Sequence, residues 1–483
     1  MTKPIDQNRN IPNEMTSCIQ DTNLPVQKEM KEYGTPEHSL TDIGNAERFV
    51  TEHVHNTRYC QDTNNWLIYE KGRFVSDYGG LVLEKAETTV KGIYSEAHKE
   101  NISLIEREKI LAHAKKSSTP GKMKAMLKLS QYKEKIMVRA HELDTDPYLF
   151  NSKNGTLHLE TGELKGHSIE DLLTKKSPIN YNADAKCPIW DGFVKQIMNN
   201  SQEKIDFLQR IFGYALTGEV NEQCLFILYG RGANGKSTMI ETIREILGNY
   251  AMNVSSSTLL SQNFLSIRND IARLNGPRFV SAAEVPMGRK LDETLVKQLT
   301  GGENVTSRFL YKEVFEYRPA FKLFLSTNHK PEIRGVDEGI WRRIHLIPFD
   351  VSIPEEQIDK QLPAKLKSEL EGILAWVVRG CIEWQKRGLD VPDDVRRATA
   401  QCRKEMDLLD EFLEDECTIG PGNKISLADA YSGYAQWADQ VCQDAIGKNA
   451  FGNLMKQRGF AQSKSGGVRY WIGLNKKQVT STS

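Results

Sequence analysis

Apolar positions in the middle of the chain switch between short continuous runs, which are typical of buried strands, and the helical spacing of three to four residues. The clearest example is LFILYGRGANGKSTMIETIREIL, residues 225–247, where an apolar run leads through a glycine-rich turn into a helix expected at about 237–247. RFVSAAE (278–284) and FKLFLSTN (321–328) predict two further strands, each ending in a polar residue. Residues 220–350 thus alternate strands with helices, which predicts a mostly parallel sheet.

The flanking regions carry other patterns. Two alternating segments, 65–75 and 151–164, predict hairpins around Lys-Gly, Asn-Gly and Thr-Gly turns. Helical patterns cover 84–143, with a break at SSTPGK, and also 187–216 and 360–412. Near the end of the chain, two helices are followed by a hairpin around Gly466-Gly467, an order that suggests a winged helix. The aromatic residues at 431, 434 and 437 are expected in its core.

Composition narrows the class of protein. The 483 residues are 39% hydrophobic and 27% charged, with a formal net charge of zero, so any nucleic-acid site must be a local basic patch. No apolar run reaches the roughly 18 residues of a membrane span, and the N-terminus lacks the apolar segment of a signal peptide. The cysteines form no CxxC pair. We therefore expect a soluble protein of the cytoplasm with reduced thiols and no membrane partner.

The glycine-rich turn has the layout of a phosphate-binding loop. Its glycines let backbone N–H groups turn toward phosphate oxygens, the lysine meets the terminal phosphates, and the following serine hydroxyl reaches Mg²⁺. We expect ATP and Mg²⁺ as cofactors. The residues expected to bind the nucleotide are Gly230, Gly232, Asn234, Gly235, Lys236, Ser237 and Thr238.

Polar residues after the neighbouring strands complete the expected site. Glu284 could polarise the attacking water and hold Mg²⁺, and Asn328 could orient that water or sense the γ-phosphate. In GIWRRIHLIPF, Arg342 or Arg343 could reach the ATP of a neighbouring subunit. The alternatives are a solvated surface glutamate, an ordinary asparagine that ends a strand, and a structural arginine ion pair.

These four pieces resemble the helicase domain of superfamily 3. More closely, the chain resembles the C-terminal half of the phage and plasmid primase-helicases, a family related to the poxvirus primase-helicase. Besides the loop, the resemblance rests on LTDIGNAERFV, WLIYEKGRF and NGTLHLETGELKGH in an accessory region. In the core it rests on CPIWDGF, LQRIFGYALTG, LTGGENVTSRFLYKE and LSTNHKPEIRGVDEGIWRRI.

The resemblance implies roles for single residues. Lys236 and Ser237 become the Walker A pair, Glu284 the Walker B acid, Asn328 the sensor and Arg343 the favoured arginine finger, with Arg342 as the alternative. It also implies that Lys312, at the tip of a hairpin, grips single-stranded DNA in the channel of a homo-oligomeric ring, a hexamer. One departure is that Ala283 stands where many relatives have a second acid. Asp292 is a weak candidate to replace it.

The resemblance also implies an α/β multidomain fold with an AAA+-like P-loop core, an α+β accessory domain and a C-terminal winged helix. The expected parts are a flexible tail (1–40), the accessory domain (41–185), a helical collar (186–219), the ATPase (220–350), a helical region (351–412), the winged helix (413–476) and a tail (477–483).

The C-terminal region is locally basic. Residues 443–483 contain seven Lys or Arg and one acid, as duplex-DNA binding would require. The candidate DNA contacts there are Lys448, Lys456, Arg458, Lys464 and Arg469. A wing that contacts protein is the alternative.

The leading hypothesis is an ATP-dependent DNA helicase that replicates a phage, prophage or plasmid-like element in the bacterial cytoplasm. Relatives often carry a primase domain upstream, but only about 40 polar residues precede the accessory domain here, so intrinsic priming is disfavoured and a separate protein could supply the primase. The competing hypothesis is an origin-binding initiator whose ATPase drives assembly only.

Overall fold

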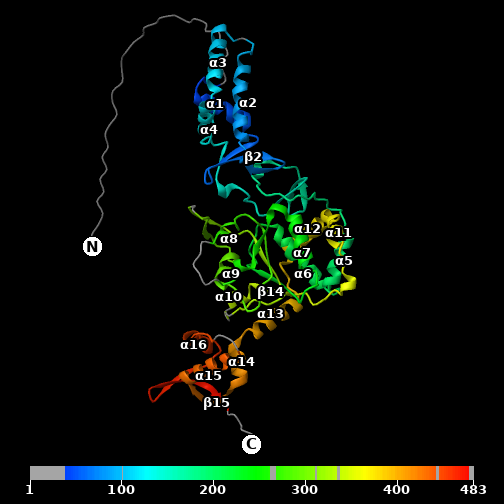
Figure 1. The fold of residues 1–483 in the computed structure, drawn as a ribbon, viewed down its shortest axis with the longest axis vertical. Coiled ribbons are helices and arrows are strands. Elements are labelled where there is room, and N and C mark those ends of the chain that lie inside the picture. The colour runs from blue at the N-terminus through cyan, green and yellow to red at the C-terminus, as the bar shows by residue number, and fades with distance from the viewer. Residues whose placement is uncertain are drawn as a thin grey trace, which may run out of the picture. The chain divides into compact units, whose positions relative to one another are not determined.

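The computed structural model describes residues 38–100, 102–261, 268–310, 313–333, 335, 338–441 and 445–477 (Figure 1). Within this part, contacts divide the chain into two units. The first contains residues 38–52 and 83–130, and the second contains residues 53–82 and everything described from 131 onward.

The first unit is helical. Its helices are α1 (Asp42–His53), α2 (Leu81–Glu96), α3 (Leu104–Ser117) and α4 (Pro120–Ser130), with the end of α1 and the start of α2 in the second unit. Helix α3 begins at a capping box, in which the Ser103 hydroxyl accepts from the Glu106 N–H and the Glu106 carboxylate accepts from the Ser103 N–H. The Arg48–Glu96 ion pair, 2.7 Å between Nε and Oε1, joins α1 to α2.

The second unit begins with two small sheets, which confirm the expected hairpins. One has the order β3-β2-β1-β4 and the other the order β5-β6-β7. Their strands are β1 (Thr57–Cys60), β2 (Asn65–Glu70), β3 (Arg73–Ser76), β4 (Met137–Val138), β5 (Leu149–Ser152), β6 (Gly155–His158) and β7 (Glu163–Lys165). The β5–β6 turn is Lys153–Asn154 and the β6–β7 connection contains Gly162, which has a φ of 77°.

The five-stranded sheet has the order β14-β8-β13-β10-β9, and every neighbouring pair is parallel. The expected parallel sheet is therefore confirmed. Its strands are β8 (Leu225–Tyr229), β9 (Ala251–Ser255), β10 (Phe279–Ala283), β13 (Lys322–Thr327) and β14 (Ile344–Pro348). Helix α7 (Lys236–Leu247) carries the chain from β8 to β9 at the far edge, so the strand order reverses beside β8.

Helices cover both faces of this sheet, which explains why its strands read as continuous apolar runs. On one face, Phe226 and Leu228 of β8 pack in a core with α5 (Pro188–Ile197), α6 (Gln202–Leu216), α7, α11 (Leu362–Lys367) and α12 (Leu370–Arg387). On the other face, Leu225 and Ile227 pack with α8 (Asn269–Ala272), α9 (Glu293–Thr300) and α10 (Glu338–Trp341). Figure 1 shows these two groups of helices on opposite sides of the sheet.

An antiparallel hairpin, β11 (Val305–Arg308) and β12 (Val314–Tyr317), projects from the segment between α9 and β13. It confirms the hairpin expected there. Helix α13 (Asp393–Glu405) follows α12 and supplies Cys402 to the second core.

The C-terminal domain has the element order α14 (Leu408–Glu416), β15 (Cys417–Ser426), α15 (Leu427–Gln440), α16 (Lys448–Gln457), β16 (Gln462–Ser465) and β17 (Val468–Lys476). The three strands form an antiparallel sheet of order β15-β17-β16. Tyr434 and Trp437 are buried in its core with Leu409 and Phe412, so the expected core role of these aromatic residues is confirmed. Helix α14 begins before the expected boundary at 413.

No helix in the described ranges combines the length and the apolar character that crossing a membrane would need.

Candidate nucleotide site

The turn between β8 and α7 has a backbone that few residues can adopt. Gly232, Ala233 and Gly235 have φ values of 103°, 47° and 80°. Gly230 has no room for a side chain, because a Cβ there would lie 2.4 Å from the Phe349 carbonyl oxygen and 2.3 Å from Asn234 Nδ2. This tight, left-handed turn brings the chain to the N-terminus of α7, where free N–H groups and the helix dipole favour an anion.

Lys236 is the first residue of α7, and it is 4% exposed. Its Nζ donates to the Gly230 carbonyl oxygen at 2.7 Å, to Asn234 Oδ1 at 2.9 Å and to Asn328 Oδ1 at 3.1 Å. All three are neutral oxygens, and burial lowers the pKa of the lysine to about 8. The ammonium is therefore held in place by groups that do not neutralise its charge.

The Asn234 side chain holds the loop in place through two hydrogen bonds. It is 3% exposed, and its Nδ2 donates to the Phe349 carbonyl oxygen at 3.2 Å while its Oδ1 accepts from Lys236. The amide therefore ties the loop to the chain that leaves β14.

Asn328 and Glu284 lie at the same edge of the sheet as the loop. Thr327 is the register partner of Tyr229, and Ala283 is the partner of Ser326, so the carboxyl ends of β8, β13 and β10 lie side by side. Ligands of open parallel sheets bind at this edge, where the strand order reverses. The sequence alone does not fix this strand order, which is what brings the three polar residues to one place.

Glu284 has a strained backbone. Its φ is 58°, a left-handed value that is rare for residues other than glycine. The Glu284 N–H donates to the Ser326 carbonyl oxygen at 2.9 Å, and the Glu284 carbonyl oxygen accepts from the Ser256 hydroxyl at 2.9 Å. These bonds hold the turn while the side chain stays exposed. Such strain costs of order 1–3 kcal/mol and is common at functional sites.

A groove of about 580 Å³ continues from the first turn of α7 toward α11. Ser237, which is exposed, and Thr238 line it at the end nearest the loop. Its other walls are Glu241, Thr242, Arg244, Glu245, Pro363, Lys367 and Leu370. A groove of this size is in the range of small-molecule sites.

The two candidate finger arginines differ sharply. Arg343 is 8% exposed, and its guanidinium donates to Thr300 Oγ1 at 3.2 Å, to the Gly339 carbonyl oxygen at 2.5 Å and to Gln223 Oε1 at 3.4 Å. Arg342 is exposed, and its guanidinium makes one long hydrogen bond within the described part of the chain, 3.3 Å from Nη2 to Gln223 Oε1. The burial therefore favours Arg342 over Arg343 as a group that another subunit could use. Gln223, which contacts both arginines, belongs to no motif.

Lys312 and Asp292 are two further residues for which the sequence suggested a role. Lys312 lies outside the described residues, although both strands of its hairpin are described. Asp292 caps α9, where its carboxylate accepts from the Leu295 N–H at 3.0 Å. A capping role accounts for that acid.

The basic residues of the C-terminal domain fall into two groups. Lys464 and Arg469 are register partners in the β16–β17 hairpin and both are exposed, as are Lys448 and Lys456 on α16. Like charges placed opposite each other in a hairpin destabilise it, which favours an external anion as their partner.

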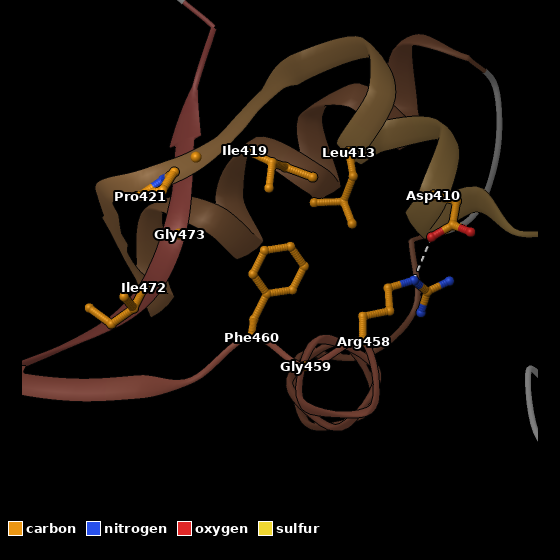
Figure 2. Close-up of a pocket in the computed structure, with 10 residues that line it drawn as sticks. Asp410, Leu413, Ile419, Pro421, Arg458, Gly459, Phe460, Ile472 and Gly473 are labelled. Atoms are coloured by element: carbon orange, nitrogen blue, oxygen red, sulfur yellow. Dashed lines mark hydrogen bonds and ion pairs between the residues drawn. The ribbon is translucent and has the colours of Figure 1, made fainter.

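Arg458 behaves differently. Its side chain forms ion pairs with Asp407 and with Asp410, the latter 2.5 Å between Nε and Oδ1. Figure 2 shows Arg458 turned toward Asp410 at one end of a pocket that is otherwise mostly apolar. Its charge is thus already balanced within the domain.

Comparison with known proteins gives two matches to family models. Residues 46–199 match a family described as "D5 N terminal like", and residues 228–343 match a "Family of unknown function".

Three of the similar proteins come from viruses. "Putative helicase L207/L206" of Acanthamoeba polyphaga mimivirus is 27% identical over 320 residues, which are 61% of this chain and 33% of that protein. "Putative helicase 022R" of Frog virus 3 is 29% identical over 251 residues, 47% of this chain and 25% of that protein. "Putative primase C962R" of African swine fever virus is 19% identical over 400 residues, 75% of this chain and 41% of that protein. The chain thus spans well under half the length of these relatives.

Among solved structures, the apo NrS-1 C-terminal region superposes with a TM-score of 0.50 at 10% identity, covering 86% of this chain and 95% of that one. That likeness concerns the fold. Fold and site together define a mixed α/β multidomain protein with a glycine-rich loop at the carboxyl edge of a parallel sheet. The matched domain and the viral relatives make the chain similar to viral proteins named as helicases and primases.

Proposed function

We propose that this chain is an ATP-driven DNA helicase of superfamily 3 that works in the replication of a phage, prophage or related element. The observation that carries the proposal is Lys236, a buried ammonium held by three neutral oxygens at the carboxyl edge of a parallel sheet. A buried ammonium whose charge no carboxylate neutralises is suited to bind a polyanion such as a nucleoside triphosphate.

The chain's own residues fit ATP and Mg²⁺. The N–H groups of the left-handed loop would surround phosphate oxygens, and Lys236 would move from neutral partners to the terminal phosphates. Ser237 and Glu284 would hold Mg²⁺, which supplies charge neutralisation at the phosphates when bound. Asn328, which already reaches Lys236, would orient the attacking water. The groove that begins at Thr238 is the place for the nucleoside.

Completion of the site from a neighbouring subunit is part of the proposal. Arg342, rather than the buried Arg343, would act as the finger that stabilises transition-state charge across an interface. The ring, a hexamer, would place the β11–β12 hairpin and Lys312 in its channel, where each hydrolysis event would pull on one DNA strand.

The C-terminal domain supports a contact with duplex DNA. Its helix, strand, two-helix and hairpin order matches a winged helix, and Lys464 and Arg469 lie on the hairpin that would be the wing. This domain also favours the second candidate, an origin-binding initiator whose ATPase drives assembly only.

ATP hydrolysis in the presence of single-stranded DNA and Mg²⁺ tests the proposal. We expect DNA-stimulated hydrolysis by the wild-type chain and a loss of at least about 10²-fold in Lys236→Ala, because the terminal phosphates lose their cation. Lys297→Ala, a lysine of α9 on the other face of the sheet, is the control. Equal hydrolysis by Lys236→Ala and wild type would show that the loop is not the site.

A further inference from the structure

The α3–α4 hairpin of the first unit carries a concentration of positive charge that the site above does not use. Residues 109–130 contain six lysines and neither aspartate nor glutamate, in a protein whose net charge is zero. We propose that Lys115, Lys116, Lys124 and Lys128, here called the α3–α4 basic surface, bind the phosphate backbone of DNA.

These four side chains are available to a partner. All four are exposed, and none forms an ion pair within the described part of the chain. Lys122, from the same stretch, is different, because its Nζ lies 2.8 Å from Asp42 Oδ2 on α1. Two acids of the first unit, Asp42 and Glu96, are thus already paired with Lys122 and Arg48 and not with these four lysines.

The fold places these lysines on the outer side of the hairpin. The buried positions of α4 are Met123, Met126, Leu127 and Ser130, so Lys124 and Lys128, one helical turn apart, lie on the opposite face. Lys115 and Lys116 occupy the last turn of α3, and only the short connection 118–119 separates the two helices. Lys115 and Lys116 therefore lie beside the connection between the helices, and Lys124 and Lys128 continue the exposed positive charge along α4.

Helix dipoles account for part of this arrangement. Lys115, Lys116 and Lys128 lie in the last turns of α3 and α4, where a cation suits the dipole, and Lys122 in the first turn of α4 is paired with Asp42. The exposed lysines nevertheless repel one another, and no nearby acid within residues 109–130 offsets this repulsion. An external polyanion would balance the remaining charge.

The ligand is the phosphodiester backbone. Lysines present point charges without the planar donor pattern that reads base edges, so binding should not depend on sequence. This inference rests on the proposed function only in taking DNA as the available polyanion, because it concerns binding and requires no ATP hydrolysis. Labelled single-stranded and duplex oligonucleotides identify which form the surface prefers.

The experiment measures fluorescence anisotropy of these oligonucleotides with the full chain, without nucleotide, between about 50 and 200 mM salt. The test variant is K115Q/K116Q/K124Q/K128Q. The charge-matched control is K91Q/K99Q/K195Q/K360Q, four exposed lysines outside the surface. If each lysine meets one phosphate, the slope of log K against log salt for single strands falls by about 3 in the test variant and stays unchanged in the control.

The pairs K115Q/K116Q and K124Q/K128Q, made separately, should each remove about half of that change, and they keep the test valid if the fourfold variant folds poorly. Wild-type slopes in the test variant, or equal losses in test and control, would overturn the inference. If the helicase proposal fails, the wild-type chain will show no ATP hydrolysis or no strand displacement, while the salt dependence of its DNA binding stays as predicted.

Discussion

At the scale of single residues, the Lys236 ammonium is held in a fixed position without a carboxylate to neutralise its charge. Three oxygens orient its ammonium, yet none is a carboxylate, and burial lowers its pKa to about 8. Triphosphate binding would favour the charged form and raise that pKa. The lysine should therefore take up a proton when nucleotide binds above about pH 8.

Calorimetry in buffers of different ionisation enthalpy measures this proton directly. At about pH 9 the free lysine is mostly neutral and phosphate groups, with a pKa near 6, are fully ionised. We expect uptake of close to one proton and an affinity that falls as pH rises through 8. Lys236→Arg is the control, because arginine stays protonated and removes the buffer dependence. A buffer-independent enthalpy in the wild type would contradict this account of the lysine.

The two adjacent arginines make a second prediction at this scale. Arg343→Ala should destabilise the fold by about 2–4 kcal/mol, because it empties a buried site and removes the donor to the Thr300 hydroxyl and one of the two donors to Gln223. Arg342→Ala should fold normally, bind nucleotide and lose about 10³-fold or more in hydrolysis.

Mixing subunits checks which arginine acts between them. Lys236→Ala subunits keep Arg342, so adding them to inactive Arg342→Ala subunits should restore part of the hydrolysis at mixed interfaces. A fully active Arg342→Ala, or a stable but inactive Arg343→Ala rescued in the same way, would assign the finger to Arg343 instead. The sequence could not separate the two, since burial of one arginine depends on its distant contact with α9.

At the scale of elements, Arg458 connects two helix ends. It follows α16 and pairs with Asp407 and Asp410 at the start of α14, so each charge also suits the dipole of its own helix. Replacing it with alanine should destabilise the C-terminal domain by about 1–3 kcal/mol, as expected for a partly buried pair.

Hydrogen exchange in the full chain reports this change as faster exchange of the α15 and α16 amides, by about 5- to 100-fold. Lys456→Ala, an exposed neighbour, should leave exchange unchanged and weaken DNA binding. Unchanged exchange in Arg458→Ala together with weaker DNA binding would mean that Arg458 contacts DNA directly.

Elements also show what a sequence can and cannot predict. Strands β8, β10 and β13 were predictable because burial on both faces makes them continuous apolar runs, and α7 because its apolar residues have a helical period. The hairpins were predictable from their turn residues. The order β14-β8-β13-β10-β9 was not, since it depends on contacts between distant segments. The left-handed Glu284 and the contact of Asn328 with Lys236 are likewise tertiary features without a local signal.

At the scale of the whole molecule, a net charge of zero hides a strongly uneven distribution. Positive charge gathers on the α3–α4 hairpin and on the C-terminal hairpin, while the candidate nucleotide site lies in the sheet domain between them in sequence. A protein that couples nucleotide hydrolysis to movement on DNA needs both kinds of site, and local patches allow DNA binding without an overall basic composition.

Strand displacement on a forked DNA substrate with ATP and Mg²⁺, comparing wild type with Lys236→Ala, tests the helicase proposal directly. We predict displacement by the wild type and none by the variant. If the wild type hydrolyses ATP on single-stranded DNA but displaces no strand, the helicase proposal is contradicted, and the origin-binding initiator becomes the better account.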